Sequence, residues 1–196
     1  MVTNEEIRND WFKNHVAKFE KINDTISILD WKKQGTMSYY VRYVFDGSHV
    51  YITGDLGEAV MNLTWFATPK SFLGIDLHYF HEKLAAYHEE KSSWDSDSAV
   101  ENLKYWVKEY REEELEEDEK GQNDDLLKEL IDLAEGCTSK SEWAYEINEN
   151  YADKLSNIDC DYWEWIYGVG DVIPNRFRAY LVGLQMAAEQ LEAAQS

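Results

Sequence analysis

The spacing of apolar residues predicts an amphipathic helix near the start of the chain and a strand after it. Within residues 4–22 apolar side chains recur at spacings of three and four, and Asn4 is in position to cap the helix. The predicted apolar stripe consists of Ile7, Trp11, His15, Val16, Phe19 and Ile22. Thr25–Trp31 instead alternates between apolar and polar positions, so we expect a short strand there.

The densest run of β-forming residues lies in Ser38–Trp65. Tyr39–Phe45 and Val50–Thr53 are separated by Asp46-Gly47-Ser48-His49, and Asp-Gly between two β-rich runs predicts a hairpin. Both faces of the first strand are largely apolar. The sheet is therefore expected to be covered on both sides, or covered on one side and used for binding on the other. Glu58–Leu63 fits a further strand or the start of a helix.

After Thr68-Pro69 the spacing of apolar residues becomes helical and stays so. Helices are expected over Ser71–Tyr87, Ser96–Glu119, Asp124–Ala134, Thr138–Leu155 and Asn175–Ala194. We therefore predict an α+β fold, in which a small antiparallel sheet (hairpin or meander) packs with five or six α-helices. A single domain, 1–196, is expected, with the N-terminal helix and meander in 1–66 and the helical part in 67–196.

Charge changes this picture because it is concentrated in the middle of the chain. The formal net charge is −20, and residues 89–164 contribute −17 of it through 25 acidic and 8 basic side chains. Direct binding of DNA, RNA or an anionic membrane needs a basic face, so none of these is expected. Trp163 and Trp165 are expected in the core, because base-stacking platforms lie beside basic side chains.

Acidic residues of the middle helices are the candidate partner-binding residues. Eight of them lie in Glu109–Glu119, near a helix C-terminus where the macrodipole disfavours negative charge. The spacing of the last four, at four, three and four residues, predicts one row on a helix. A solvated helix face remains the alternative interpretation. The candidates are Glu109, Glu112, Glu113, Glu114, Glu116, Glu117, Asp118, Glu119, Asp124, Asp125, Glu142, Glu146, Glu149 and Asp153.

Motifs for catalysis, metals or cofactors are weak. His78-Tyr79-Phe80-His81-Glu82, with His88 further along, matches no zinc-protease order, so surface or core-edge histidines are expected. Gly54-Asp55-Leu56-Gly57 lacks the Lys-Ser/Thr of a phosphate loop and the third glycine of a dinucleotide fingerprint, which makes it a turn. Cys137 and Cys160 are expected as free thiols. The sequence therefore predicts no catalytic residues, no metal and no cofactor.

Two segments resemble a known group of proteins. Tyr39–Val60 (YYVRYVFDGSHVYITGDLGEAV) and Arg176–Leu191 (RFRAYLVGLQMAAEQL) are similar to parts of small acidic proteins from phages and prophages of Gram-positive bacteria. The resemblance covers both ends of the chain and carries no catalytic residues. It implies a phage-encoded accessory protein, in a setting where anti-CRISPR and other anti-defence proteins act. The chain has no membrane-length apolar run and no secretory signal, so the cytoplasm of the bacterial host is the expected location.

Charge and context together favour an inhibitor of a bacterial defence system. In this anti-CRISPR-like hypothesis, acidic helices 96–119 and 124–153 act as a DNA mimic and bind a basic, nucleic-acid-binding surface of a host nuclease. One alternative is a phage structural or assembly protein, or a homo-oligomer. Another is a small nucleotide-binding protein or enzyme, whose cationic pocket would draw on Lys32, Lys33, Arg42, Arg176 and Arg178.

Overall fold

The computed structural model describes the backbone of residues 2–111 and 117–194, and the side chains of residues 2–106 and 124–194. It has the predicted α+β fold with an antiparallel sheet. Two compact units are distinguished: a sheet unit, Met1–Lys91 with Ile173–Ser196, and a helical unit, Ser92–Val172. Each has a hydrophobic core of its own. The expected single domain stays a prediction.

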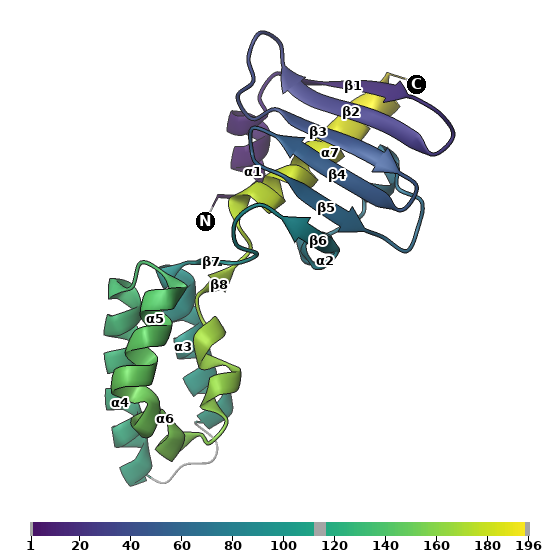
Figure 1. The fold of residues 1–196 in the computed structure, drawn as a ribbon. Coiled ribbons are helices and arrows are strands. Elements are labelled where there is room, and N and C mark those ends of the chain that lie inside the picture. The colour runs from purple at the N-terminus through teal and green to yellow at the C-terminus, as the bar shows by residue number, and fades with distance from the viewer. Residues whose placement is uncertain (1, 112–116, 195–196) are drawn as a thin grey trace. The chain divides into compact units, whose positions relative to one another are not determined.

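The sheet unit contains a six-stranded meander in which each strand pairs with the next one along the chain (Figure 1). Its strands are β1 (His15–Lys21), β2 (Ile26–Lys33), β3 (Val41–Asp46), β4 (His49–Gly54), β5 (Ala59–Asn62) and β6 (Leu84–Tyr87). The predicted hairpin is confirmed, because Asp46 pairs with His49 and leaves Gly47 and Ser48 as a two-residue loop. Gly47 has a φ of 60°, the positive value that such loops require.

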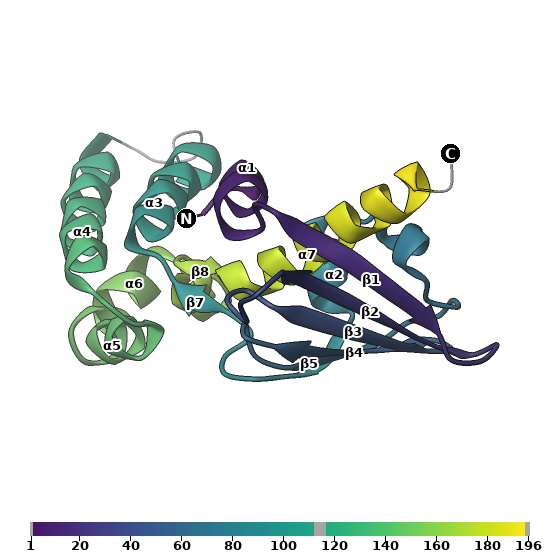
Figure 2. The ribbon, with the colours of Figure 1, turned by 90° about the horizontal axis from the view of Figure 1, so that it is seen from above.

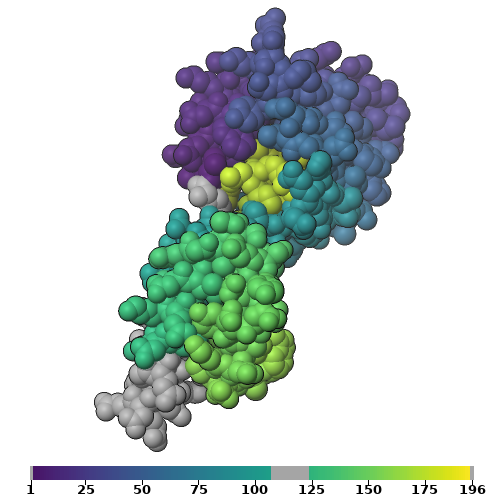
Figure 3. Space-filling model, turned by 60° about the vertical axis from the view of Figure 1, so that its left-hand side comes forward, coloured from purple at the N-terminus to yellow at the C-terminus, as the bar shows by residue number. Residues whose placement is uncertain are grey.

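One face of the sheet is covered by the helix α7 (Asn175–Ala193), which Figures 1 and 2 show crossing it. Residues on alternate positions of β3 (Val41, Tyr43 and Phe45) are fully buried against it. The Tyr43 hydroxyl donates to the carbonyl of Tyr180 at 2.7 Å. A Cβ on Gly183 would lie only 3.0 Å from the side chains of Trp31 and Tyr43, so glycine lets the helix lie close to the sheet. Figure 3 shows C-terminal residues between segments from the first half of the chain.

The expected helix over residues 4–22 is wrong beyond Trp11. A short helical segment, α1 (Asn4–Glu6) and the π-helical η1 (Ile7–Trp11), is capped by Thr3, whose hydroxyl accepts from the Glu6 amide at 3.2 Å. Asn14 then adopts a φ of 66°, and the chain continues as β1. Pairing of β1 with β2 along its full length overrides the local helical spacing.

The expected helix over Ser71–Tyr87 is also wrong. The chain forms a 3₁₀ turn, η2 (Pro69–Phe72), then α2 (Leu77–Glu82), and ends this stretch in β6. Asp76 begins α2 as its cap, with a carboxylate oxygen that accepts from the Tyr79 amide at 2.8 Å. Glu58–Leu63, which fitted either element, contains β5.

Within the described residues of the sheet unit, no helix covers the second face of the sheet (Figure 2), so of the two expected arrangements the one with a single covered face remains. The open face carries an apolar row of direct cross-strand neighbours and, beside it, a polar row. The apolar row consists of Ile28, Val44, Tyr51, Val60 and Ala86. The polar row runs through Lys18, Asp30, Arg42 and Thr53. Use of this face for binding stays a prediction.

Asp30 is the buried centre of the polar row, with 8 % of its surface exposed. Arg42 donates from Nε and Nη2 to its two carboxylate oxygens at 2.7 and 2.9 Å, and the Tyr40 hydroxyl donates at 2.6 Å. The guanidinium hydrogen bonds lower the pKa of Asp30, although burial opposes them. Burial, together with the bond to Asp30, raises the pKa of Tyr40 to about 12.

Replacing Asp30 with asparagine is expected to destabilise the protein in a pH-dependent way. Because the folded-state pKa of Asp30 lies below its unfolded value, the carboxylate stabilises the fold above about pH 4. That contribution is lost as the pH falls through the folded-state pKa. Asp30→Asn should therefore lower the urea midpoint more at pH 7 than at pH 3. The control Asp24→Asn removes an exposed pair with Lys21 and should change little at either pH; an equal loss for Asp30→Asn at both pH values would contradict this account.

The helical unit consists of successive helices between two short strands, and these strands pair with each other as an antiparallel ribbon. Its elements are β7 (Ser93–Trp94), α3 (Ser96–Arg111), α4 (Glu117–Gly136), α5 (Lys140–Glu146), η3 (Ile147–Tyr151), α6 (Ala152–Ile158), η4 (Tyr162–Glu164), η5 (Ile166–Gly168) and β8 (Asp171–Val172). β7 pairs with β8. The helix expected over Asp124–Ala134 begins earlier, and the one expected over Thr138–Leu155 consists of α5, η3 and α6. In the described ranges, no helix has both the length and the apolar composition of a membrane span.

Candidate functional site

Negative charge is concentrated in the helical unit. Ser92–Val172 holds 24 acidic and seven basic side chains, a net charge of −17, whereas the sheet unit has a net charge of −3. The charge imbalance that the sequence places in its middle therefore coincides with a compact unit that has its own core. This unit is the candidate partner-binding site.

The fourteen predicted site residues differ in how far the structure describes them. Glu112–Glu114 and Glu116 lie outside the described residues. Glu109 belongs to α3, and Glu117–Glu119 to α4, but their side chains are outside the described set. The other six side chains, on α4, α5, η3 and α6, are at least partly exposed. We call them the acidic residues of α4–α6: Asp124, Asp125, Glu142, Glu146, Glu149 and Asp153.

A π-helical turn changes the periodicity of the α5–α6 segment. The buried residues Trp143, Ile147 and Leu155 recur at multiples of four, so positions four apart face the same core. η3, which separates α5 from α6, takes more residues per turn than the 3.6 of an α-helix. The segment therefore advances by about 90° per residue, averaged over these positions.

With that rotation we expect the four carboxylates to form two pairs, and the single row stays a prediction. Glu142 and Glu146 are then expected on one side of the segment, and Glu149 and Asp153 on another, about a quarter turn away. Tyr145 lies four residues before Glu149 and is expected on the same side. Its side chain is 63 % exposed. The second pair is thus accompanied by an exposed aromatic ring that is not among the fourteen predicted site residues.

The two pairs differ in their hydrogen bonds. Glu142 accepts from the Thr138 amide and hydroxyl at 2.8 and 3.0 Å, and these bonds lower its pKa. Glu146 accepts from the Asn150 side-chain amide at 2.7 Å. Among the residues with described side chains, no group forms a hydrogen bond or ion pair with the carboxylates of Glu149 and Asp153. Those two carboxylates are therefore the more available to a partner.

Aromatic packing fixes the acidic helices despite their mutual repulsion. Trp143 is fully buried, its indole N–H donates to the Ile166 carbonyl at 2.8 Å, and its ring lies 5.3 Å from that of Trp94. An ion pair between Lys154 and Glu129, at 2.6 Å, joins α6 to α4. That pair is half-exposed and contributes little, so the apolar core is the main source of stability.

The aromatic residues near Tyr162–Tyr167 are only partly in the core. Trp165 packs as expected: its ring is stacked at 3.9 Å on that of Trp106. Trp163 is 53 % exposed, so the prediction of core packing is wrong for this residue. Trp163 lies in the short 3₁₀ turn η4, next to Glu164, which is also exposed.

The weaker sequence motifs form no reaction centre in the described residues. His78 Nε2 lies 3.3 Å from a Glu82 oxygen, and His81 Nε2 lies 2.8 Å from the Lys91 carbonyl. Within the described residues, no group of three or more His, Cys, Asp or Glu side chains is placed to hold a metal ion. Cys137, which is buried, and Cys160, which is exposed, are free thiols, as predicted.

Protein groups already bind three of the five cations that a nucleotide pocket would use. Arg42 forms the bidentate pair with Asp30. Arg176 donates to Glu89 at 2.7 Å, and Arg178 donates to the Asn4 side chain at 3.2 Å. An anionic ligand would have to displace these partners.

Comparison of the chain with protein-family models, with curated proteins and with solved structures finds no match. A functional interpretation therefore depends on the charge and geometry of this chain. The acidic residues of α4–α6 are the feature that departs most from an ordinary protein surface.

Proposed function

We propose that the protein inhibits a bacterial defence system by binding a basic, nucleic-acid-binding surface of a host effector protein through its helical unit. The observation that supports this most is the charge separation, with −17 in the helical unit and −3 in the sheet unit. The class of partner comes from the resemblance of Tyr39–Val60 and Arg176–Leu191 to phage and prophage proteins. The protein acts as a binder in this proposal, with no catalytic step.

Electrostatics explains how such a unit competes with nucleic acid. A nucleic-acid groove attracts phosphates through Lys and Arg, and carboxylates held on rigid helices meet the same cations. Opposite potentials accelerate association, and like charges repel acidic proteins that are wrong partners. Because the Debye length is about 10 Å at 0.1 M salt and about 3 Å at 1 M, inhibition should weaken as ionic strength rises.

Tyr145 gives this surface a centre for specific contact. Tyrosine is enriched among the residues that dominate interface energies, since a rigid ring contributes a large contact area. Here the exposed ring lies on the same side as the two carboxylates without internal partners, Glu149 and Asp153. An arginine-rich surface can pair with the carboxylates and stack on the ring.

A charge-neutralising variant tests the proposal directly. Glu146→Gln/Glu149→Gln/Asp153→Asn is compared with the native protein for inhibition of DNA cleavage by purified RNA-guided nucleases of Gram-positive hosts. If each of the three carboxylates forms an exposed ion pair with a partner cation worth about 0.5 kcal/mol, their loss predicts a roughly tenfold loss of inhibitory potency. The control, Glu20→Gln/Asp24→Asn/Asp46→Asn, removes the same charge from the exposed surface of the sheet unit and should change potency less than about threefold.

Two results would count against the proposal. Equal losses for the two triple variants would mean that net charge alone, rather than the acidic residues of α4–α6, determines inhibition. If the native protein inhibits none of several defence nucleases, the anti-defence class itself is wrong.

The alternatives have less support. A net charge of −20 on each copy opposes a homo-oligomer, because like-charged chains repel. The ion pairs of Arg42 and Arg176 oppose a nucleotide site. Light scattering and a thermal-shift screen against nucleotides test the two alternatives in turn.

A further inference from the structure

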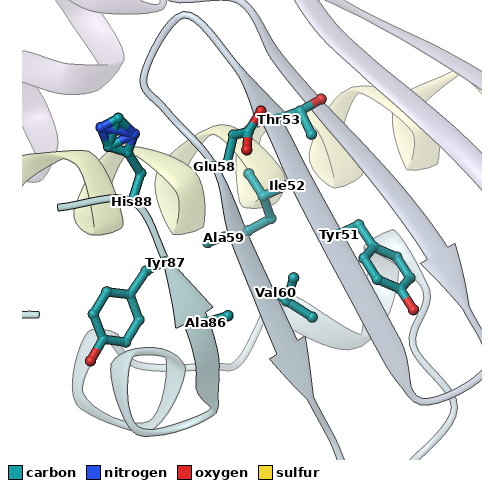
Figure 4. Close-up of a pocket in the computed structure, with 9 residues that line it drawn as sticks. All are labelled: Tyr51, Ile52, Thr53, Glu58, Ala59, Val60, Ala86, Tyr87 and His88. Atoms are coloured by element: carbon teal, nitrogen blue, oxygen red, sulfur yellow. The ribbon is translucent and has the colours of Figure 1, made fainter.

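The open face of the sheet has a hollow of about 440 Å³ over β4, β5 and β6 (Figure 4). Its volume lies in the range of small-ligand sites, roughly 300–1,000 Å³. Tyr51, Val60 and Ala86 form an apolar part of its lining. Thr53 and Glu58 lie beside each other at one end of the group in Figure 4, away from the Tyr51 ring.

The register of the sheet creates this hollow. Tyr51, Val60 and Ala86 are direct cross-strand neighbours, so one large side chain stands beside two small ones. The Tyr51 ring is stacked on that of His49, with centroids 6.4 Å apart and an interplanar angle of 19°. Beneath lie buried residues, including the paired Ile52 and Ala59, so the floor is rigid.

The charge of the hollow favours a cationic ligand. Glu58 is exposed, and within the described residues its carboxylate forms no hydrogen bond or ion pair. Arg42, on the neighbouring β3, is already bound to both oxygens of Asp30. The sheet unit, which contains the hollow, has a net charge of −3, so its overall charge also favours a cation.

We infer that this hollow binds an arginine side chain of a basic partner protein. The aliphatic stem lies along Val60 and Ala86, and the guanidinium reaches the Glu58 carboxylate. Arginine combines an apolar stem with a charged head that bonds to a carboxylate through two parallel N–H groups. This contact lies in the sheet unit and does not depend on the acidic residues of α4–α6.

A nuclear magnetic resonance titration tests the inference with a blocked alanine–arginine–alanine peptide at millimolar concentration. We expect the amide signals of Tyr51, Glu58 and Ala86 to shift in proportion to occupancy. The peptide with citrulline, which is neutral and nearly isosteric with arginine, should bind about fivefold more weakly. Glu58→Gln should weaken arginine binding by a similar factor, whereas Glu20→Gln, an equal charge change at the far edge strand, should not.

Filling the hollow provides a second, charge-independent test. Ala86→Leu should abolish the shifts at Tyr51 and Glu58, whereas Ala85→Leu, an exposed neighbour that does not line the hollow, should retain them. Equal binding of the arginine and citrulline peptides, or unchanged binding to Glu58→Gln and Ala86→Leu, overturns the inference. The inference is also overturned if the peptide shifts amide signals only in the helical unit. It is overturned as well if the protein forms a dimer that Glu58→Gln dissociates, because a second copy would then occupy the hollow.

Discussion

Replacing Gly54 with alanine is expected to destabilise the protein by about 3 kcal/mol or more. Gly54 has a φ of 145°, where side chains are strained, and a Cβ there would lie 2.1 Å from the carbonyl oxygen of Tyr40. That carbonyl accepts from the Asp55 amide at 2.8 Å, so the turn cannot relax without breaking this bond. The midpoint of urea unfolding, followed by circular dichroism, measures the loss.

Gly35→Ala is the matched control for this prediction. Gly35 also has a positive φ, 81°, but a Cβ there would meet nothing within 4 Å. Its cost is therefore conformational, about 1–2 kcal/mol. If Gly54→Ala lowers stability no more than Gly35→Ala, the close approach of Tyr40 does not constrain the turn.

Replacing Trp143 with alanine should unfold α5 and α6 locally and thereby remove the proposed inhibitory binding. Truncating a buried tryptophan costs about 3–5 kcal/mol, and the Ile166 carbonyl loses its donor. Hydrogen exchange across Lys140–Ile158 should accelerate strongly. Because the unit has a net charge of −17, added salt should restore part of the lost stability of α5 and α6 by screening the repulsion between their carboxylates.

Trp143→Phe separates packing from hydrogen bonding. It keeps an aromatic ring in the core and loses only the bond to Ile166 and part of the volume, so we expect a cost of about 1–3 kcal/mol. Binding should then stay near the native value. Native exchange rates in α5 and α6 of the Trp143→Ala variant would show that this core does not fix the acidic residues.

Elements with strong local signals could be predicted from the sequence. Asp46-Gly47 supplies the positive φ of a two-residue loop, and the hairpin formed as expected. The final helix, expected over Asn175–Ala194, is α7 almost to the residue. In both cases neighbouring residues determine the structure, so no knowledge of distant partners is needed.

Elements at the edges of the sheet could not be predicted, because distant pairing determines them. Val16 and Phe19 fit a helical spacing, yet in β1 they point to opposite faces, and both are exposed. β6 contains two alanines, which favour helices, and is a strand because it pairs with β5. In an edge strand the alternation of buried and exposed residues is weak, so pairing with the neighbouring strand determines the structure more than local helix propensity does.

The candidate site was predictable in charge but not in geometry. The concentration of acids was evident from their count, whereas the π-helical turn that separates Glu146 from Asp153 left no sequence signal that we can identify. The hollow depends on cross-strand neighbours, Tyr51 with Val60 and Val60 with Ala86. Such neighbours follow only from a register that the sequence did not reveal.

The position of α7 has a consequence for synthesis on the ribosome. The strands emerge first, but the helix that covers their apolar face is translated only after the whole helical unit. At a translation rate of about 5–20 residues per second, α7 is synthesised on the order of ten seconds after the strands, and their apolar face stays uncovered during that time. The helical unit is continuous in sequence and can fold during this delay. Until α7 is made, the nascent sheet exposes apolar surface of the kind that makes partly folded chains prone to aggregation.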